Sequence, residues 1–392
     1  MTFDPQKLDI RALQFRDLDA IEALLPQALT ARSSGSILDL ATHLDRIRSY
    51  YALLTCLSWL PTHYQHLFSV FVAEKNRQIQ GAVQVSPFNR GATTWRIDRL
   101  IADPGSGAQD TSTALIRHCL QNLWKARTWL AEVKVSNTDA MAIYRQNGFQ
   151  CLTQVTHWDF SAELLSELSQ REPDLPNLMP VSNSDAPLLY QLDTASMLPH
   201  VRQVYDRHVC DFKTSLFDSV MDGFKRWMSK TDSVAGYVFE PQRKAAIGYF
   251  QMQLSRQGTF PHSAELTVHP AYTWLYPELL AQMARVTREL PAQSLRLTSA
   301  DYQTEREEFF QRVGARSVEH TQLMSRSVWH KLRETKQVTL EGLQLSDVLG
   351  GLQPARKPIP SRWLQHLYEL ESHKLESHKE EKKPDNPHHD PN

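Results

Sequence analysis

The stretch VSNTDAMAIYRQNGF, at residues 135–149, carries the strongest local pattern in this sequence of 392 residues. It follows a run of strand character at residues 128–136, and its periodicity predicts a helix over residues 138–147. We expect Gly148 to end that helix in the left-handed conformation and Phe149 to pack into the core. The stretch therefore marks a strand-to-helix unit of an α/β domain.

Outward from this stretch, the same order of elements occurs twice along the chain. In the first pass, a strand and a helix with Asp17 as its N-cap precede a second helix, a hairpin, and alternating strands and helices. These elements are expected at residues 10–29, 38–60, 67–87, 93–104, 111–126, 128–136, 138–147 and 154–160. The second pass follows a proline-bearing junction at residues 169–180, and Gly248 stands in its hairpin where Gly81 stands in the first. Its elements are expected at residues 184–192, 234–254, 264–270, 276–289, 294–300 and 307–313.

Strands that alternate with helices behind a hairpin predict a mixed sheet with helices on both faces. The predicted fold class is therefore α/β, with two tandem domains at residues 1–165 and 176–335. A strap that packs back on the second domain, or a docking segment for a partner, is expected at residues 336–370. Residues 371–392 repeat an ESHK unit, are charged and proline-rich, and are expected to form a disordered tail.

Composition argues against several classes of protein. Hydrophobic residues make up 41% of the chain and charged residues 22%, as in an ordinary globular protein. The formal net charge of −1 gives no field that would attract nucleic acid. The four cysteines form no CxxC pair, which argues against a metal site or a disulfide framework and favours a cytoplasmic location. No apolar run approaches the roughly 20 residues of a membrane-spanning helix, and no signal peptide is evident.

The segment from Asn137 to Phe149, with Ala140, Tyr144 and Gly148 between them, resembles the closing motif of the GNAT N-acetyltransferase superfamily. Upstream, LIADPGSGAQDTSTALI at residues 100–116 stands where that family has the strand, glycine-rich turn and helix that bind coenzyme A. The resemblance spans both passes. It implies that the two central parallel strands of each sheet splay apart and that acetyl-CoA lies between them.

The resemblance also implies roles for individual residues. Tyr144 corresponds to the general acid that protonates the departing thiolate, and a phenol with a pKa near ~10 suits a thiol leaving group; a plain core tyrosine is the alternative. Asp98 and Glu132 are candidate general bases for the substrate amine, although Arg96 or Arg99 would pair equally well with Asp98. The helix start would receive the pyrophosphate. The cofactor-binding candidates are Leu100, Ile101, Ala102, Gly107, Ala108, Asp110, Thr111, Ser112, Asn137 and Ala140.

The phosphate loop departs from the family pattern, because Asp110 and Ser112 stand at positions that are normally small. An aspartate before Thr-Ser-Thr at a helix start is a strong N-cap, so Asp110 is expected to satisfy the N–H groups that a pyrophosphate would use. Its charge would also repel phosphate. The alternative is a turn shifted by Gly105 and Gly107, with hydroxyl groups that compensate.

The second pass departs further. After His269 and Pro270 its loop has no glycine, and Trp274 and Tyr276 stand where the phosphates would lie. Phe310 takes the place of Tyr144, and it has no proton to donate. Gln303 and Arg306 replace the family's Asn and Ala. The second domain is therefore predicted to keep the fold and to have lost the site.

The sequence thus predicts an acetyl-CoA-dependent N-acetyltransferase that acts through its first domain on an unknown amine, small molecule or protein. One alternative is a catalytically silent assembly factor that contacts a protein complex through aromatic inserts or the segment at residues 336–370. The inserts contain Tyr50, Tyr51, Trp59, Tyr64, Phe217, Phe224 and Trp227. A further alternative is an acyl-CoA sensor.

Overall fold

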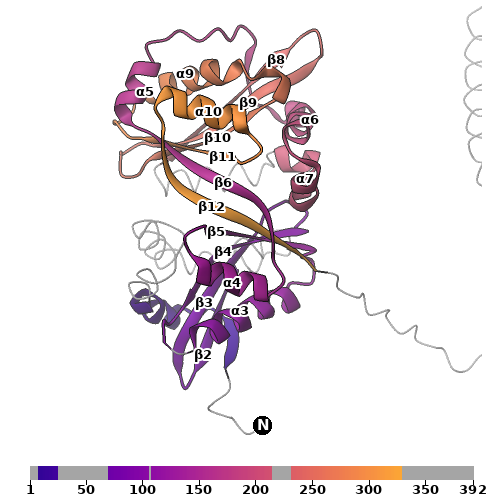
Figure 1. The fold of residues 1–392 in the computed structure, drawn as a ribbon, viewed down its shortest axis with the longest axis vertical. Helices are drawn as coiled ribbons and strands as arrows, with labels where there is room; N and C mark the ends of the chain where they lie inside the picture. The colour runs from indigo at the N-terminus through magenta and orange to yellow at the C-terminus, as the bar shows by residue number, and fades with distance from the viewer. Residues whose placement is uncertain (1–7, 25–68, 106, 214–230, 329–392) are drawn as a thin grey trace, which may run out of the picture. The chain divides into compact units, whose positions relative to one another are not determined.

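The computed structural model describes residues 8–24, 69–105, 107–213 and 231–328 (Figure 1). The helix expected at residues 38–60, the segment at 336–370 and the tail at 371–392 lie outside the described residues, as do the aromatic inserts. Among the described helices, none is long and apolar enough to cross a membrane.

Within the residues that the structure describes, the predicted order of elements is present in both passes. The first half comprises β1 (Asp9–Ala12), η1 (Phe15–Asp17), β2 (Ser69–Lys75), β3 (Gln78–Pro87), β4 (Thr94–Ala102), α3 (Ala108–Asn122), β5 (Thr128–Lys134), α4 (Thr138–Gln146), β6 (Gln150–Phe160) and α5 (Ala162–Leu168). The second half comprises β7 (Leu178–Pro180), η3 (Asn183–Asp185), α6 (Ala186–Ser196), α7 (Pro199–Tyr205), η4 (Val209–Phe212), β8 (Thr231–Glu240), β9 (Ala245–Ser255), β10 (His262–Val268), η5 (Pro270–Tyr272), α9 (Leu275–Thr287), β11 (Leu295–Ala300), α10 (Thr304–Val313) and β12 (Arg316–Ser327).

The strands of both halves form one continuous sheet in the order β1-β2-β3-β4-β5-β12-β6-β11-β10-β9-β8-β7. The last strand of each half is exchanged, because β12 pairs with β5 of the first half and β6 pairs with β11 of the second. The two exchanged strands also pair with each other (Figure 1). The sequence predicts one sheet for each half, and the exchange joins these two sheets into one.

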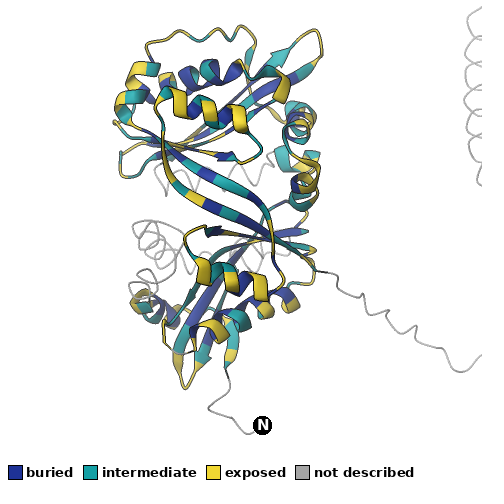
Figure 2. Cartoon of the chain, viewed as in Figure 1, coloured by how far each residue is buried: buried dark blue, intermediate teal, exposed yellow. Residues whose placement is uncertain are grey.

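Each half has its own hydrophobic core between the sheet and its helices (Figure 2). In the first half, Trp95 of β4, Trp129 of β5 and Leu115 of α3 are at most 1% exposed. In the second half, α9 buries Leu275 and Leu279 completely against the strands. Burial of this much apolar surface is the main term that holds the helices on the sheet.

Asp17 directly precedes the α-helix that begins at Leu18, which is the N-cap position predicted for it. It is also the last residue of η1, whose own N-cap is Gln14, and its carboxylate accepts a hydrogen bond from the Gln14 backbone N–H at 2.8 Å. Arg11 of β1 donates two more hydrogen bonds to it, at 2.6 and 2.8 Å. The short 3-10 turn before the α-helix was not predicted from the sequence.

Gly81 of β3 and Gly248 of β9 occupy equivalent positions in the two halves. At each position a neighbouring atom lies too close to leave room for a Cβ atom. A Cβ atom at Gly81 would lie 2.6 Å from the carbonyl oxygen of Ile101 in the neighbouring strand. At Gly248 it would lie 2.9 Å from Cδ1 of Leu279, which is the end of a side chain. A side chain adjusts more easily than the backbone of a central strand.

We therefore predict that Gly81→Ala lowers the free energy of unfolding by about 1–3 kcal/mol, as overpacked sites do, and that Gly248→Ala lowers it by less. Urea denaturation followed by circular dichroism measures both. Gly91→Ala is the control, because its Cβ would make only ordinary contacts at 3.7 Å. A loss at residue 248 that equals the loss at residue 81 would contradict this account.

Candidate functional site

In the first half, the pairing of the parallel strands β4 and β5 ends early. Their last pair is Ile97↔Ala131. β4 then continues to Ala102 beside β3, and β5 continues to Lys134 beside β12. The two strands therefore diverge toward their carboxyl ends, and we call this divergence the first splay.

A β-bulge lies where the first splay begins. The register between β3 and β4 pairs Gln84 with Arg99 and Val85 with Ile97, which leaves Asp98 as an extra residue. A bulge bends its strand and increases the local twist. β4 therefore turns away from β5 immediately after their last pair.

α3 follows β4 after a loop that contains Gly105 and Gly107. Gly107 is the N-cap of the helix, and no side chain caps it. A Cβ atom at Gly107 would meet no heavy atom within 4 Å, so the space beside the loop is open. The first backbone N–H groups of a helix attract anions. The start of α3 thus has the room and the donors that a phosphate group requires.

Asp110 does not cap α3, contrary to the expectation from the sequence. The helix begins at Ala108, so Asp110 lies at the third helical position and is exposed. The backbone N–H of Thr111 donates to the Gly107 carbonyl at 2.9 Å, and the side chains of Ala108, Thr111 and Ser112 are buried. This packing extends the helix by one turn at its start, a gain that the capping preference of aspartate does not offset.

α4 follows β5 and carries two further candidates. Asn137 is its N-cap, and its side-chain oxygen accepts a hydrogen bond from the Ala140 backbone N–H at 3.0 Å. Tyr144 is 6% exposed and packs edge-on against Phe149, with ring centroids 5.2 Å apart. Burial raises the pKa of Tyr144 above its ordinary value, so the phenol keeps its proton at neutral pH. Gly148 has a φ of +78°, and Phe149 is buried, as the sequence predicts.

Both candidate general bases have partners. Asp98 accepts a hydrogen bond from Nε of Arg96 at 2.6 Å. Glu132, the first residue of β5 beyond its last pair with β4, accepts one from Oγ1 of Thr321 at 2.6 Å and lies 2.8 Å from Nε2 of His157. Burial tends to raise the pKa of Glu132, but the hydrogen bonds from His157 and Thr321 outweigh burial and hold the pKa below its usual value. A carboxylate of lowered pKa is a weak proton acceptor, so Glu132 alone is a poor base.

The sequence analysis does not identify His157. This residue lies in the alternating strand QVTHWDF, whose pattern says only which side chains share a face. Its contact with Glu132 depends on the strand order β5-β12-β6, in which only β12 lies between the two strands that carry these side chains. Only the pairing order of the strands shows that contact.

The second half contains an equivalent divergence of β10 and β11, which we call the second splay. Their last pair is Ser263↔Arg296. Arg306 of α10 is 5% exposed, and its guanidinium donates to the carbonyl of Leu266 in β10 at 2.6 Å and to that of Thr298 in β11 at 3.1 Å. One arginine therefore bridges the two strands where they have separated.

Arg306 has the position in α10 that Ala140 has in α4. Four residues later, Phe310 corresponds to Tyr144, and each helix is followed by a glycine of positive φ. Phe310 is fully buried. The two splays share a backbone arrangement and differ in the side chain that enters from the following helix.

Comparison with known proteins agrees with this arrangement. Residues 38–149 match the model of the Acetyltransferase (GNAT) family. The family match therefore covers the first half of the chain, from the segment before β2 to the end of the α4 motif. The second half repeats the same order of strands and helices, so the chain has the fold of a tandem GNAT protein.

Two solved structures share the fold. A tandem GNAT protein from the clavulanic acid biosynthesis pathway is 16% identical, with a TM-score of 0.52, and the match covers 82% of this chain and 98% of that one. A GCN5-related N-acetyltransferase from Sphaerobacter thermophilus is 12% identical, with a TM-score of 0.50, and the match covers 83% and 97% of the two chains. At these identities the likeness concerns the fold alone. No curated protein sequence matches the chain.

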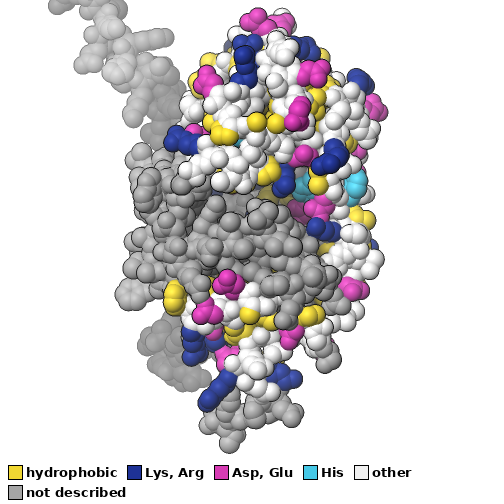
Figure 3. Space-filling model, turned by 90° about the vertical axis from the view of Figure 1, so that its left-hand side faces the viewer, with side chains coloured by type: hydrophobic (Ala, Val, Ile, Leu, Met, Phe, Trp, Pro, Cys, Tyr) yellow, Lys and Arg dark blue, Asp and Glu magenta, His cyan; other side chains and the backbone are white. Residues whose placement is uncertain are grey.

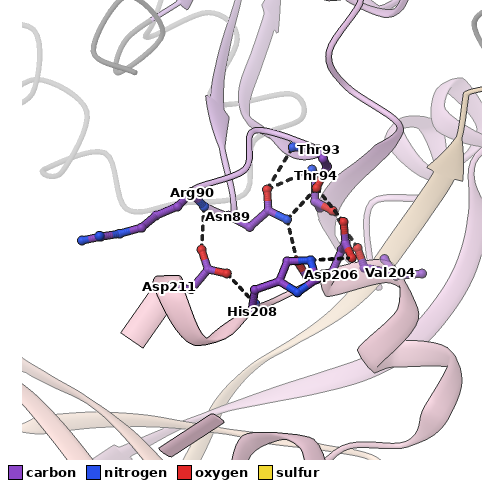
Figure 4. Close-up of polar contacts among 8 residues, drawn as sticks. All are labelled: Asn89, Arg90, Thr93, Thr94, Val204, Asp206, His208 and Asp211. Atoms are coloured by element: carbon purple, nitrogen blue, oxygen red, sulfur yellow. Dashed lines mark hydrogen bonds and ion pairs between the residues drawn. The ribbon is translucent and has the colours of Figure 1, made fainter. Parts of the chain in front are cut away.

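A polar network joins the two GNAT halves outside the sheet (Figure 4). Nδ2 of Asn89, in the loop between β3 and β4, donates to the backbone carbonyl of Asp206 at 2.7 Å. Oγ1 of Thr93 donates to the Asp206 carboxylate at 2.6 Å, and the Arg90 backbone N–H donates to Asp211 at 2.6 Å. The segment after α7 therefore holds the loop that leads into β4 of the first GNAT half.

We predict that Arg306→Ala lowers the free energy of unfolding by about 2–5 kcal/mol, because the buried carbonyl of Leu266 and the partly buried carbonyl of Thr298 lose a charged donor. Guanidinium denaturation measures the loss. Arg296→Ala, at an exposed position of β11, is the matched control and should change stability by less than ~0.5 kcal/mol. Similar losses for the two variants would show that the bridge contributes nothing.

Proposed function

We propose that the protein transfers an acetyl group from acetyl-CoA to a primary amine, and that the first GNAT half carries this activity. The observation that supports the proposal is the first splay, followed by an uncapped and open start of α3. From Asp98 onward, one edge of β4 no longer faces β5, so its backbone groups on that side are directed into the splay. A ligand with amide groups would satisfy them.

Acetyl-CoA supplies an activated acetyl thioester, and the residues present fit it at three places. The start of α3 at Gly107 would bind the pyrophosphate, although the Ala108 N–H already donates to the Gly105 carbonyl at 3.1 Å. The strand backbone at residues 100–102 would bind the pantetheine arm and hold the thioester oxygen. Ala140 has no side-chain donor that would compete with the ligand as Arg306 does in the second splay, and Asn137 stands at the start of the same helix.

The remaining chemistry belongs to Tyr144 and a base. The amine nitrogen attacks the thioester carbon, and the Tyr144 hydroxyl gives its proton to the thiolate that departs. Because burial keeps this phenol protonated, it meets the first requirement of a general acid. Its position in the core also fixes the ring through contact with Phe149.

We further propose that the second GNAT half does not bind acetyl-CoA. The guanidinium of Arg306 occupies the second splay, and Phe310 has no proton to donate. The N-cap of α9 is Trp274, whose side chain is 54% exposed at the helix start where phosphate would approach. Arg306, Phe310 and Trp274 thus each argue against acetyl-CoA binding or acetyl transfer in the second half.

An assembly factor without activity is the alternative, and the inserts that suggest it lie outside the described residues. On the face shown in Figure 3, the described residues carry Lys and Arg side chains interspersed with Asp and Glu side chains. Hydrophobic side chains on that face are scattered between the charged ones. This face therefore gives no specific support to the alternative.

We predict that calorimetric titration finds one acetyl-CoA bound per chain, and that tyramine or spermidine then accelerates thiol release. Tyr144→Phe should keep the affinity and lower turnover by about 10²–10⁴-fold, as loss of a general acid does. Tyr272→Phe, in η5 of the second half, is the control. Absence of binding at millimolar acetyl-CoA would overturn the proposed function. Two sites per chain would show that the second half also binds acetyl-CoA. Unchanged turnover of Tyr144→Phe would show that Tyr144 is not the general acid.

We predict that Asp110→Asn tightens acetyl-CoA binding a few-fold, because an exposed carboxylate at the start of α3 repels phosphate, with solvent weakening the effect. Calorimetry at 20 mM and 300 mM salt measures it, and the gain should shrink at high salt. Glu163→Gln, in the first turn of α5, removes an equivalent helix-start charge away from the splay. If both variants bind equally well, the charge of Asp110 does not face the ligand.

A further inference from the structure

Three strands of the shared sheet bring Glu132, His157 and Thr321 into one hydrogen-bonded group. Oγ1 of Thr321 donates to Oε1 of Glu132 at 2.6 Å, and Nε2 of His157 lies 2.8 Å from the same oxygen. Nε2 also lies 3.2 Å from Oγ1 of Thr321. The group needs both exchanged strands, since β6 supplies the histidine and β12 the threonine.

The group lies on the face of the sheet opposite α3 and α4. Trp129, Ala131 and Val133 of β5 belong to the first core, so Glu132 between them points to the other face. In β6, Trp158 belongs to the second core, and His157 beside it likewise points away. The side chains of His157 and Glu132 are 34% and 37% exposed, so solvent and small molecules reach the pair.

The group also lies at the first splay. Glu132 is the first residue of β5 beyond the last pair with β4, and Asp98 is the bulged residue on the opposite strand. Asp98 is neutralised by Arg96, whose charge also acts on Glu132. Of the two carboxylates that flank the splay, only Glu132 is therefore linked to a second titratable group that can take up a proton.

The hydrogen bonds of His157 involve one ring nitrogen and leave the other able to accept a proton. The ionised Glu132 carboxylate accepts only, so Nε2 of His157 is the donor in their hydrogen bond and carries the proton in the neutral ring. Nδ1 is then the basic nitrogen, and it has no hydrogen-bond partner among the described residues. A carboxylate that holds one nitrogen of a histidine orients the ring and leaves the other nitrogen to accept a proton.

We propose that His157 is the general base for the acceptor amine and that Glu132 positions it, an inference that rests on the proposed acetyl transfer. The neutral amine attacks the thioester carbon, a C–N bond forms and the C–S bond breaks. The amine proton passes to Nδ1 of His157, and the thiolate takes the proton of Tyr144. Proton return from the imidazolium to the phenolate, through solvent, restores both groups.

Three other described histidines lack this combination of features. His320 of β12 lies on the opposite face and contacts Oγ1 of Thr156 at 3.2 Å. His262 is fully buried, and its Nδ1 accepts from a backbone N–H. His269 accepts a hydrogen bond from the Ala271 backbone N–H through Nδ1, as the cap of η5. None of these three is linked to a carboxylate beside the first splay.

The test uses the full chain and follows thiol release from acetyl-CoA with tyramine, with spermidine, and with water alone. His157→Ala should lower kcat by about 10²-fold or more, as loss of a general base does, without changing the dissociation constant of acetyl-CoA measured by calorimetry. Added imidazole at tens of millimolar should restore a substantial part of the lost rate. His320→Ala, the matched control, should keep the rate and show no response to imidazole.

Glu132→Gln should lower kcat less than His157→Ala and should not respond to imidazole, because its histidine is still present. If acetyl-CoA binds and His157→Ala keeps the wild-type rate, the assignment of His157 is wrong while the proposed function stands. A lost rate that imidazole does not restore, in a variant that still binds acetyl-CoA, would reduce His157 to a structural role and overturn the proposal. If acetyl-CoA does not bind the wild-type protein, both proposals fall.

Discussion

The separation of β4 from β5 after Ile97 and Ala131 is the constraint from which most of the structure follows. Two parallel strands that part leave backbone groups on their facing edges without a strand partner, and such groups must be satisfied in another way. The exchanged strands do not satisfy these groups, because β12 pairs with the edge of β5 that lies away from β4, and β6 pairs with the edge of β11 that lies away from β10. The exchange joins the two halves and leaves the facing edges of each splay to be satisfied by other groups.

The two splays differ in how the unpaired backbone groups of the diverging strands are satisfied. In the second, a guanidinium from α10 donates to one carbonyl of each strand. In the first, the equivalent helix position is Ala140, whose methyl group offers no donor. Under the proposed function, the amides of the pantetheine arm form hydrogen bonds with the strand backbone of the first splay, as Arg306 does in the second. Under the same proposal, the substitution of Arg306 for the alanine is one of three that separate a binding half from a supporting half of the same fold.

Local spacing in the sequence was enough to predict the order of the elements, the hairpins, the positive φ of Gly148 and the burial of Phe149. These features depend on residues a few positions apart. The exchange of β6 and β12 was not predictable in this way, because alternation along a strand shows its buried face and says nothing about its neighbour. His157 was missed for that reason. Asp110 was predicted as an N-cap although it lies inside the first turn of α3, where a carboxylate is also favourable.

The exchanged strands have a consequence for how the protein is made. Glu132 of β5 and Thr321 of β12 are 189 residues apart in the chain, yet they are neighbours in the sheet. At about 5–20 residues per second, a ribosome needs roughly 10–40 s to deliver β12 after β5 has emerged. During that interval the run TWLAEVK has an open strand edge with Trp129 and Leu130 beside it. The nascent chain therefore passes through a state prone to edge-to-edge aggregation, in which a chaperone that shields β-strands would raise the yield of folded protein.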